Sequence, residues 1–320
     1  MGWQPTMNGA RFFIAEAEKL FAKEGLDVNL IKFTAGPPFF AAFQSESIDV
    51  GFMGIQPAVT AIAQEIPVKI FAIENDAGSA EGLVARQDSG IRTLADMRGK
   101  SIATTRGSSA DTALHRALDI AGLKTVDLNI VDLDVTSLMP AFTRGDIQAG
   151  WYWEPWMGLL KREGGQLVAT DRDIAMPSGI LWVARTRWLQ QNLDAVLRLL
   201  HILDIAAARI REAPNEVSQE VAKLLDLKND HVLEFMVREG SWPTNRETYA
   251  QDYPFSMHPQ VIAAGKGIAG VMTDNAKFQK SFNIVARILE RAGSVPDYTK
   301  AVDPAPLMKY LESMPAAAKP

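Results

Sequence analysis

The chain has 320 residues, of which 47% are hydrophobic and 22% are charged, and its formal net charge is −5. This length suits two medium-sized lobes, and the negative charge argues against nucleic acid or an anionic membrane surface as a partner. Because the chain contains no cysteine, disulfides, thiolate metal sites and cysteine nucleophiles are excluded. No apolar run approaches the roughly 20 residues that cross a bilayer.

The first 73 residues alternate between expected strands and helices. Apolar residues at helical spacing, among them Phe12, Phe13 and Phe21, predict a helix that Gly25 ends. Strands are expected at residues 1–5, 26–33, 48–52 and 68–73, with further helices after the turn at 35–38 and from 54 to 63. This order is typical of a mostly parallel sheet that is covered by helices. Residues 1–5 do not have the pattern of a signal peptide, so we expect the natural protein to begin upstream.

A second series of the same kind begins after residues 83–85. It comprises a short helix at 91–97, a strand at 101–105, a helix ending at Gly122, a strand at 129–133, a helix from 137 and a strand at 147–152. The turn before the long helix contains Ser108, Ser109 and Asp111, each of which can cap the helix N-terminus. A helix N-terminus also favours anions, so this turn is either an anion site or only a cap.

Two nine-residue segments indicate that the two series are related. Residues 43–51 and 142–150 are offset by 99 positions, and the Phe, Ile and Gly of one coincide with those of the other. Both segments join a helix to a strand. The sequence therefore predicts two similar lobes.

The last part of the chain is expected to be mainly helical, at residues 195–211, 215–225, 231–238, 259–269 and 278–292, with a disordered tail at 316–320. We predict an α/β protein of two lobes, each a mostly parallel sheet flanked by helices, with a helical C-terminal region. Lobe one comprises residues 1–84 and 185–320, lobe two comprises 85–184, and the hinge lies near 83–85 and 181–185. A ligand is expected in the cleft, at the carboxyl ends of the strands.

Catalytic and metal motifs are missing from the sequence. The four histidines have no metal-ligand spacing, and there is no Gly-x-Ser-x-Gly elbow or P-loop. We therefore expect a binding protein rather than an enzyme, with no catalytic residue, cofactor or metal.

Residues 151–156 contain three tryptophans and a tyrosine at the end of an expected strand. Trp151 and Trp156 are expected in the core, whereas Trp153 is expected to form a wall of the ligand cleft. Glu154 either binds a ligand amine or forms a salt bridge across the cleft. Glu81 has the same two possibilities, a ligand ammonium or a contact that holds the hinge.

The strand ends of lobe one supply the remaining candidates. Gly54 and Gln56 lie where a strand leads into a helix, and Gln4 and Thr6 lie at the end of the first strand. Small polar side chains and helix N-termini from both lobes suit an oxyanion, and no arginine is evident at these positions. The expected ligand-binding residues are therefore Gln4, Thr6, Gly54, Gln56, Glu81, Ser108, Ser109, Trp153 and Glu154.

Several motifs resemble those of the periplasmic solute-binding proteins of ABC importers for taurine, alkanesulfonates and nitrate. The matching segments are residues 3–5, 20–28, 48–51 with Gly54, 94–103, 145–147 and 153–156, within a resemblance that covers residues 1–190. The resemblance implies a periplasmic, hinge-closing receptor of type II fold that delivers a small organic anion, such as a sulfonate, to a membrane permease and its ATPase. The family's polar turns correspond to Gln4, Gly54–Gln56, Ser108–Ala110 and Trp153, and Glu81 falls where taurine binders have Ser-Glu.

The ligand stays open at this point. Residues 177–180 lack the aspartate that taurine binders have near this strand, and related families bind nitrate, bicarbonate, aromatic acids or thiamine pyrimidines. The related thiamine-pyrimidine synthases need a cysteine-rich motif, which this chain lacks. A cytoplasmic ligand-sensing domain is the remaining alternative, although no DNA-binding helix pair is evident. We expect a monomer because the sequence has no long exposed apolar stripe.

Overall fold

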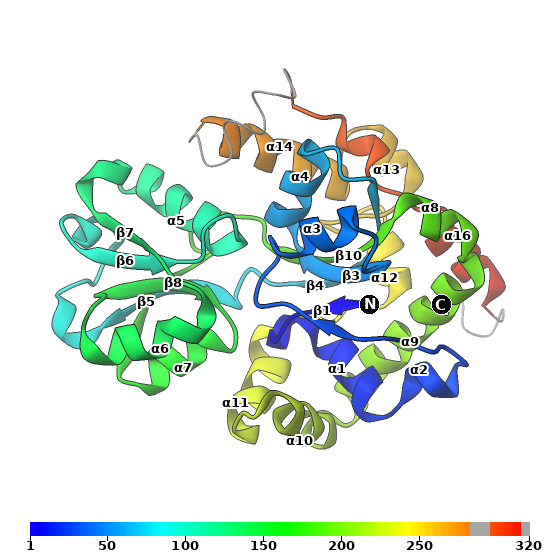
Figure 1. Ribbon diagram of the computed structural model, residues 1–320, viewed down its shortest axis with the longest axis horizontal. Coiled ribbons are helices and arrows are strands. Elements are labelled where there is room, and N and C mark those ends of the chain that lie inside the picture. The colour runs from blue at the N-terminus through cyan, green and yellow to red at the C-terminus, as the bar shows by residue number, and fades with distance from the viewer. Residues whose placement is uncertain (282–294, 315–320) are drawn as a thin grey trace.

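The computed structural model describes residues 1–281 and 295–314, and it consists of two lobes, each built on a five-stranded sheet (Figure 1). The sheet of lobe one has the order β2-β1-β3-β10-β4, and the sheet of lobe two has the order β7-β6-β8-β5-β9. The strands are β1 (Gly2–Trp3), β2 (Ile31–Lys32), β3 (Val50–Gly54), β4 (Val68–Asp76), β5 (Glu81–Arg86), β6 (Ser101–Thr104), β7 (Asn129–Asp132), β8 (Ala149–Trp153), β9 (Gly165–Thr170) and β10 (Gly179–Arg185).

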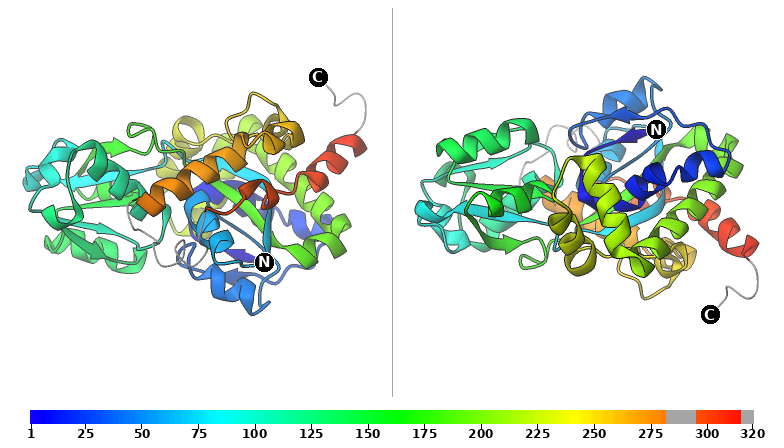
Figure 2. Two further views of the ribbon diagram at one scale, coloured as in Figure 1. Left: turned by 90° about the horizontal axis from the view of Figure 1, so that it is seen from above. Right: turned by 90° about the horizontal axis from the view of Figure 1, so that it is seen from below.

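Helices cover both sheets, as the views from above and below show (Figure 2). In lobe two they are η2 (Gln87–Ser89), η3 (Leu94–Met97), α5 (Ser109–Ile120), η4 (Thr125–Asp127), α6 (Val135–Arg144) and α7 (Trp156–Arg162). Before the crossing to lobe two, lobe one has η1 (Met7–Gly9), α1 (Ala10–Ala17), α2 (Leu20–Lys23), α3 (Phe39–Gln44) and α4 (Ile55–Ala63). After the return it has α8 (Thr186–Gln191), α9 (Leu193–Glu212), α10 (Pro214–Leu225), α11 (Asn229–Glu234), the π-helical η5 (Phe235–Glu239), α12 (Asn245–Tyr249), α13 (Pro259–Ala263), α14 (Gly267–Ser281), η6 (Tyr298–Lys300) and α16 (Ala305–Ser313).

The two sheets share one strand order, which agrees with the repeat in the sequence. Gly51 lies in β3 and Gly150 in β8, and these strands are third in their sheets. Both sheets are mixed, because β10 and β5 run antiparallel to their neighbours, while the other four strands of each sheet run in one direction. The predicted two-lobed α/β fold with mostly parallel sheets is confirmed.

The chain crosses between the lobes at residues 77–80 and 171–178, which lie between strands of different sheets. The predicted hinge residues 83–85 and 181–185 instead lie inside β5 and β10. Each of these strands is paired on both sides and almost wholly buried. An apolar run of this kind has the same pattern in a central strand as in a connection, so the sequence placed both crossings several residues too late.

Other expected elements differ in length. Of the predicted strand 26–33, only Ile31–Lys32 pairs with β1. The predicted helix 259–269 is divided into α13 and α14, with Gly265 at a positive φ of 67° between them. Residues 278–281 continue α14, whereas the rest of the predicted helix 278–292 and the tail 316–320 lie outside the described residues. Within the described residues, no helix is long and apolar enough to cross a membrane.

Each lobe has its own hydrophobic core, and that of lobe one contains a fully buried ion pair. Nη2 of Arg11 lies 3.2 Å from Oε2 of Glu74, which also accepts a 2.6 Å hydrogen bond from the indole of Trp182. Arg11 donates to the carbonyl of Pro243 at 2.8 Å. Burial raises the pKa of Glu74, and the charge of Arg11 opposes this shift. These contacts tie α1, β4, β10 and the segment before α12 together.

Candidate functional site

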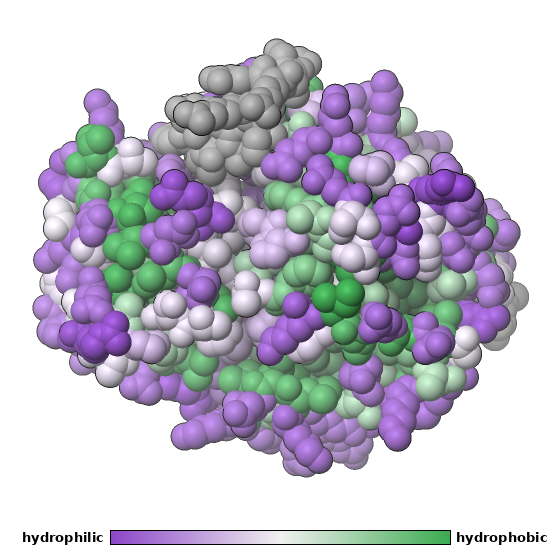
Figure 3. Space-filling view, in the orientation of Figure 1, coloured by the Kyte–Doolittle hydropathy of each residue, from purple (hydrophilic) through white to green (hydrophobic). Residues whose placement is uncertain are grey.

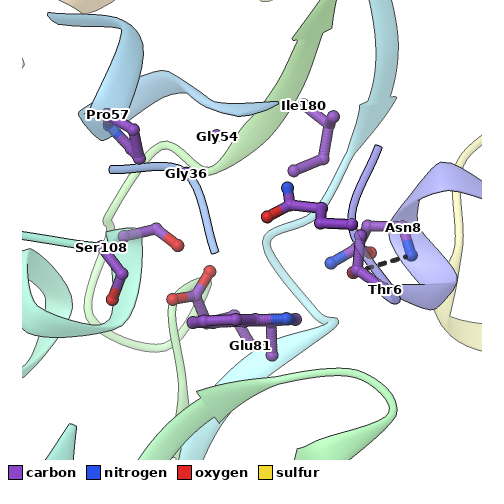
Figure 4. A pocket seen from close by; sticks show the side chains of 11 residues that line it. Thr6, Asn8, Gly36, Gly54, Pro57, Glu81, Ser108 and Ile180 are labelled. Carbon is purple, nitrogen blue, oxygen red and sulfur yellow. Dashed lines mark hydrogen bonds between the residues drawn. The ribbon is translucent and has the colours of Figure 1, made fainter. Parts of the chain in front are cut away.

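A pocket lies between the two lobes, at the ends of their central strands (Figure 4). Lobe one contributes Gln4, Thr6, Asn8, Gly36, Gly54, Pro57 and Ile180, and lobe two contributes Glu81, Ser108, Ser109 and Trp153. The free volume is about 20 Å³, enough for about one water molecule. A larger ligand therefore does not fit the pocket in this arrangement of its lining residues.

Seven of the nine predicted ligand-binding residues meet in this pocket: Gln4, Thr6, Gly54, Glu81, Ser108, Ser109 and Trp153. Gln56 and Glu154 are not among the lining residues. Asn8, Gly36, Pro57 and Ile180 line the pocket but were not predicted. The sequence does not mark these four residues as ligand-binding, because each is a small, apolar or amide residue beside a turn.

Strand ends and helix starts position these side chains. Gly54 precedes the first turn of α4, and Ser108 is the N-cap of α5, where its hydroxyl accepts from the N–H of Asp111 at 3.4 Å. Glu81 and Trp153 are partners in the register of β5 and β8. The C-terminal ends of β3, β6 and β8 thus bring both helix N-termini and Trp153 to one place, and the first residue of the antiparallel β5 adds Glu81.

The side-chain hydroxyls at the pocket already have acceptors. Thr6 donates to the carbonyl of Glu154 at 3.0 Å, and Ser108 donates to the carbonyl of Thr105 at 2.6 Å. The hydroxyl of Ser109 bonds to the carboxyl of Glu81 and lowers its pKa. A hydroxyl has one proton to donate, so these three groups do not serve a ligand oxyanion in this arrangement. The prediction that serine hydroxyls hold the anion is not supported by these hydrogen bonds.

Other groups in the pocket retain their donors. Within the described residues, no acceptor is bonded to the side-chain N–H groups of Gln4, Asn8 or Trp153. The amide oxygen of Asn8 accepts from Asn75 at 3.2 Å, which leaves its NH₂ group available. Two amides and an indole are neutral donors, and such donors suit a small oxyanion without requiring an arginine.

Glu81 is the one carboxylate that lines the pocket, and it points into it, with Ser108 on one side and Thr6 on the other (Figure 4). Its side chain is buried, and Oε1 has no donor within the described residues. Ser178 donates weakly to Oε2, at 3.5 Å. Burial raises the pKa of Glu81 to about 7, while the Ser109 and Ser178 hydroxyls oppose the shift. The pocket therefore offers an acceptor as well as donors.

Asp171 lies beside Glu81 and was not predicted. The backbone N–H of Asp171 donates to the carbonyl of Glu81 at 2.9 Å, and Trp151 donates to Oδ1 of Asp171 at 2.9 Å. The side chain of Asp171 is fully buried, and Oδ2 has no donor within the described residues. Burial, with the nearby charge of Glu81, raises the pKa of Asp171 well above its usual range. Trp151 is thus a core residue, as predicted, whereas Trp156 is only partly buried.

Glu154 contacts lobe one instead of the pocket. Its Oε2 lies 2.9 Å from Nε2 of His231 in α11 and accepts from the N–H of Gly158 at 3.1 Å. Its carbonyl accepts from Thr6 and, at 3.2 Å, from the N–H of Met7. Two roles were predicted for Glu154, and these contacts match the one across the cleft rather than the binding of a ligand amine. Gln56 donates to the carbonyl of Pro177 at 3.2 Å, in the second crossing segment.

Comparisons with known proteins agree with this architecture. Residues 6–217 match the family described as NMT1/THI5 like. A putative aliphatic sulfonates-binding protein of Bacillus subtilis (strain 168) is 29% identical over 211 residues, which cover 66% of this chain and 64% of that protein. The taurine-binding periplasmic protein of Escherichia coli (strain K12) is 29% identical over 186 residues, 57% of this chain and 58% of that protein. The chain thus matches less than two thirds of the length of either relative.

A solved structure extends the likeness of fold to nearly the whole chain. The alkanesulfonate-binding protein SsuA from Xanthomonas axonopodis pv. citri, bound to MOPS, superposes with a TM-score of 0.72 at 21% identity, covering 94% of this chain and 96% of that one. The family match spans residues 6–217, which include ten of the eleven residues that line the pocket, all except Gln4. The chain belongs to the NMT1/THI5-like family.

Proposed function

We propose that this protein is the solute-binding component of an ABC importer and that its lobes close on a small organic sulfonate. The observation that carries the proposal is the pocket, in which donors from both lobes converge without a lysine or arginine among the lining residues. Relatives named as sulfonate-binding and taurine-binding proteins support the same ligand class.

Hydrogen-bond donors from both lobes contact the same ligand. Gln4 and Asn8 of lobe one and Trp153 of lobe two supply amide and indole N–H groups to the sulfonate oxygens. The first turns of α4 and α5 add the favourable end of each helix dipole. Because a ligand held by both lobes stabilises their contact, binding shifts the protein toward the closed arrangement.

Glu81 sets a preference within the sulfonates. A buried carboxylate opposes a second negative charge unless a positive group accompanies it. We therefore expect aminosulfonates such as taurine to bind more tightly than plain alkanesulfonates of the same length. In this reading a membrane permease with its ATPase receives the ligand, the protein acts in the periplasm as a monomer, and the ligand leaves chemically unchanged.

A thermal-shift screen tests the proposal. The purified protein is heated with taurine, ethanesulfonate, larger alkanesulfonates, aromatic sulfonates, nitrate, bicarbonate and small carboxylates. A ligand present at 100 times its Kd adds about 2.7 kcal/mol to the free energy of unfolding and raises the Tm visibly. We expect the largest rise in Tm with an aminosulfonate. We also expect to recover that aminosulfonate chemically unchanged after incubation with the protein.

A pair of variants separates the pocket from the rest of the surface. Gln4→Leu removes a donor from the pocket and is expected to abolish the ligand-induced shift, whereas Gln191→Leu, at an exposed position of α8, is expected to retain it. A protein that is stabilised by nitrate or carboxylates and by no sulfonate contradicts the proposed ligand class. Conversion of a ligand to another compound contradicts the binding role.

A further inference from the structure

The carboxyls of Glu81 and Asp171 form a buried pair that has no cationic partner. Both side chains are at most 2% exposed, and no described lysine, arginine or histidine forms an ion pair with either. Oε1 of Glu81 and Oδ2 of Asp171 are both without a donor. Two adjacent buried carboxylates repel each other, and removing them from water costs several kcal/mol per charge. A bound proton relieves both penalties.

The residues around the pair do not supply the missing positive charge. Asp76 of β4 has Arg172 at 3.8 Å, and Glu154 after β8 has His231. Asp111 of α5 lies 3.6 Å from Nδ1 of His115. The hydroxyls of Ser109 and Ser178 and the indole of Trp151 are the described donors to the pair. All three are neutral, so they orient the carboxyls without balancing their charge.

We propose that Glu81 and Asp171 share a proton in the ligand-free pocket and exchange it for the ammonium group of the ligand. Glu81 makes the contact, because it lines the pocket and points into it (Figure 4). Asp171 is a positioning residue behind it. In the exchange, the ligand's nitrogen keeps all its protons and donates to Glu81, while the shared proton leaves to the solvent. Binding is therefore linked to the release of a proton.

This inference rests on the proposed function and adds a pH dependence to it. The free pair binds a proton that the ligand complex lacks, so affinity for an ammonium-bearing ligand rises as the pH increases, by up to about tenfold per pH unit. This rise in affinity ends at the pH above which the free pair no longer binds a proton. A plain sulfonate leaves the proton in place, and its affinity lacks this increase.

Isothermal titration calorimetry in buffers of different ionisation enthalpy counts the released protons. We expect the number of protons released for each taurine bound to approach one near pH 6 and to fall as the pH rises through about 7, and a count close to zero for ethanesulfonate at both values. Asp171→Asn removes the neighbouring carboxyl but leaves Glu81 buried, so taurine still binds and the pH range over which a proton is released shifts from that of the wild type. Glu81→Gln is expected to reduce the preference for taurine over ethanesulfonate at least tenfold.

Asp173→Asn is the matched control, because it makes the same chemical change at an exposed position two residues from Asp171. It should retain the wild-type proton count and ligand preference. A wild-type count of zero with taurine overturns the inference, as does an Asp171→Asn variant whose proton count matches the wild type at every pH. Equal stabilisation by sodium or calcium ions in place of taurine also overturns it, since the pair would then be a metal site.

Infrared spectroscopy of the ligand-free protein separates this inference from the proposed function. A neutral carboxyl has a carbonyl stretching band that a carboxylate lacks, and we expect one at pH 7 whose frequency or intensity changes in both Glu81→Gln and Asp171→Asn. If ethanesulfonate binds and taurine does not, the inference fails and the proposed function stands. If neither binds, the proposed function fails, and the infrared band alone decides whether the pair retains a proton.

Discussion

Arg11 shows how strongly one residue determines the stability of lobe one. Its guanidinium pairs with Glu74 and serves carbonyls of β4 and of Pro243 from a fully buried position. A buried ion pair contributes little net stability over an apolar pair, but the loss of one partner leaves the other charge without compensation.

Arg11→Met is therefore expected to lower the free energy of unfolding by about 3–5 kcal/mol. Urea denaturation measures the change. Arg187→Met, at an exposed position of α8, is the control and should lie within about 0.5 kcal/mol of the wild type. A small effect of Arg11→Met would show that water or a rearranged side chain replaces the guanidinium.

The sequence predicted the pocket residues more completely than their hydrogen bonds. Gln4, Gly54, Ser108 and Trp153 were identified because turns at strand ends converge in this topology. The hydroxyl of Ser108 is already bonded to a carbonyl. This bond depends on the rotamer of Ser108, which the sequence does not specify. Asp171 was missed because an aspartate within Thr-Asp-Arg-Asp has the pattern of a solvated turn.

At the level of elements, α5 connects the stability of lobe two to the ligand. The predicted strand, turn and helix at residues 101–122 form β6, the cap at Ser108 and α5. Ser108→Ala is expected to cost about 1 kcal/mol of stability through the lost cap. It is also expected to weaken ethanesulfonate binding about two- to fivefold, because the first turn of the helix becomes less well fixed.

Asp134→Ala is the matched control for this prediction. Asp134 caps α6, which does not line the pocket, by accepting from the N–H groups of Thr136 and Ser137 at 2.8 Å and 3.1 Å. It should lower the Tm by a similar amount and leave the Kd unchanged. Equal changes in Kd for both variants would show that the loss of a cap acts through general destabilisation.

The crossings between the lobes show that a local sequence pattern predicts a strand but not the strands with which it pairs. The strands β5 and β10 were both expected, but their patterns do not say which neighbours they pair with. Each contains an apolar run, residues 82–85 in β5 and 179–184 in β10, because the strand has a neighbour on both sides, and such a run was taken for the connection between lobes. Pairing is a long-range property, whereas periodicity is a local one.

At the level of the whole molecule, contacts across the cleft fix how the lobes meet. Glu154 and His231 are buried, at 1% and 7% side-chain exposure, whereas Arg162 and Asp230, 3.2 Å apart, are largely exposed. Arg116 of α5 also lies over the ring of Phe278 in α14, at 5.7 Å. Exposed large apolar residues include Ile120, Val126 and Leu224, and on the face in Figure 3 apolar side chains gather on lobe two, at the left, with polar ones around them.

Glu154→Gln is expected to weaken ligand binding about tenfold, because a neutral amide replaces the carboxylate whose Oε2 contacts both Gly158 and His231. Small-angle scattering should show a larger radius of gyration without ligand and the wild-type value at saturation. Arg162→Gln, which breaks the exposed pair, should change the Kd by less than about fivefold. If the two variants behave alike, burial does not determine which cross-lobe contact matters.

The position of β10 has a consequence for synthesis on the ribosome. β10 lies between β3 and β4, but the ribosome makes it only after all of lobe two. The sheet of lobe one therefore stays in two parts until residue 185 has emerged. The five strands of lobe two, in contrast, lie within residues 81–170. Nascent chains would then complete the second lobe before the first, the reverse of the usual N-terminal order. The lobe that begins the polypeptide would be the last to become resistant to protease.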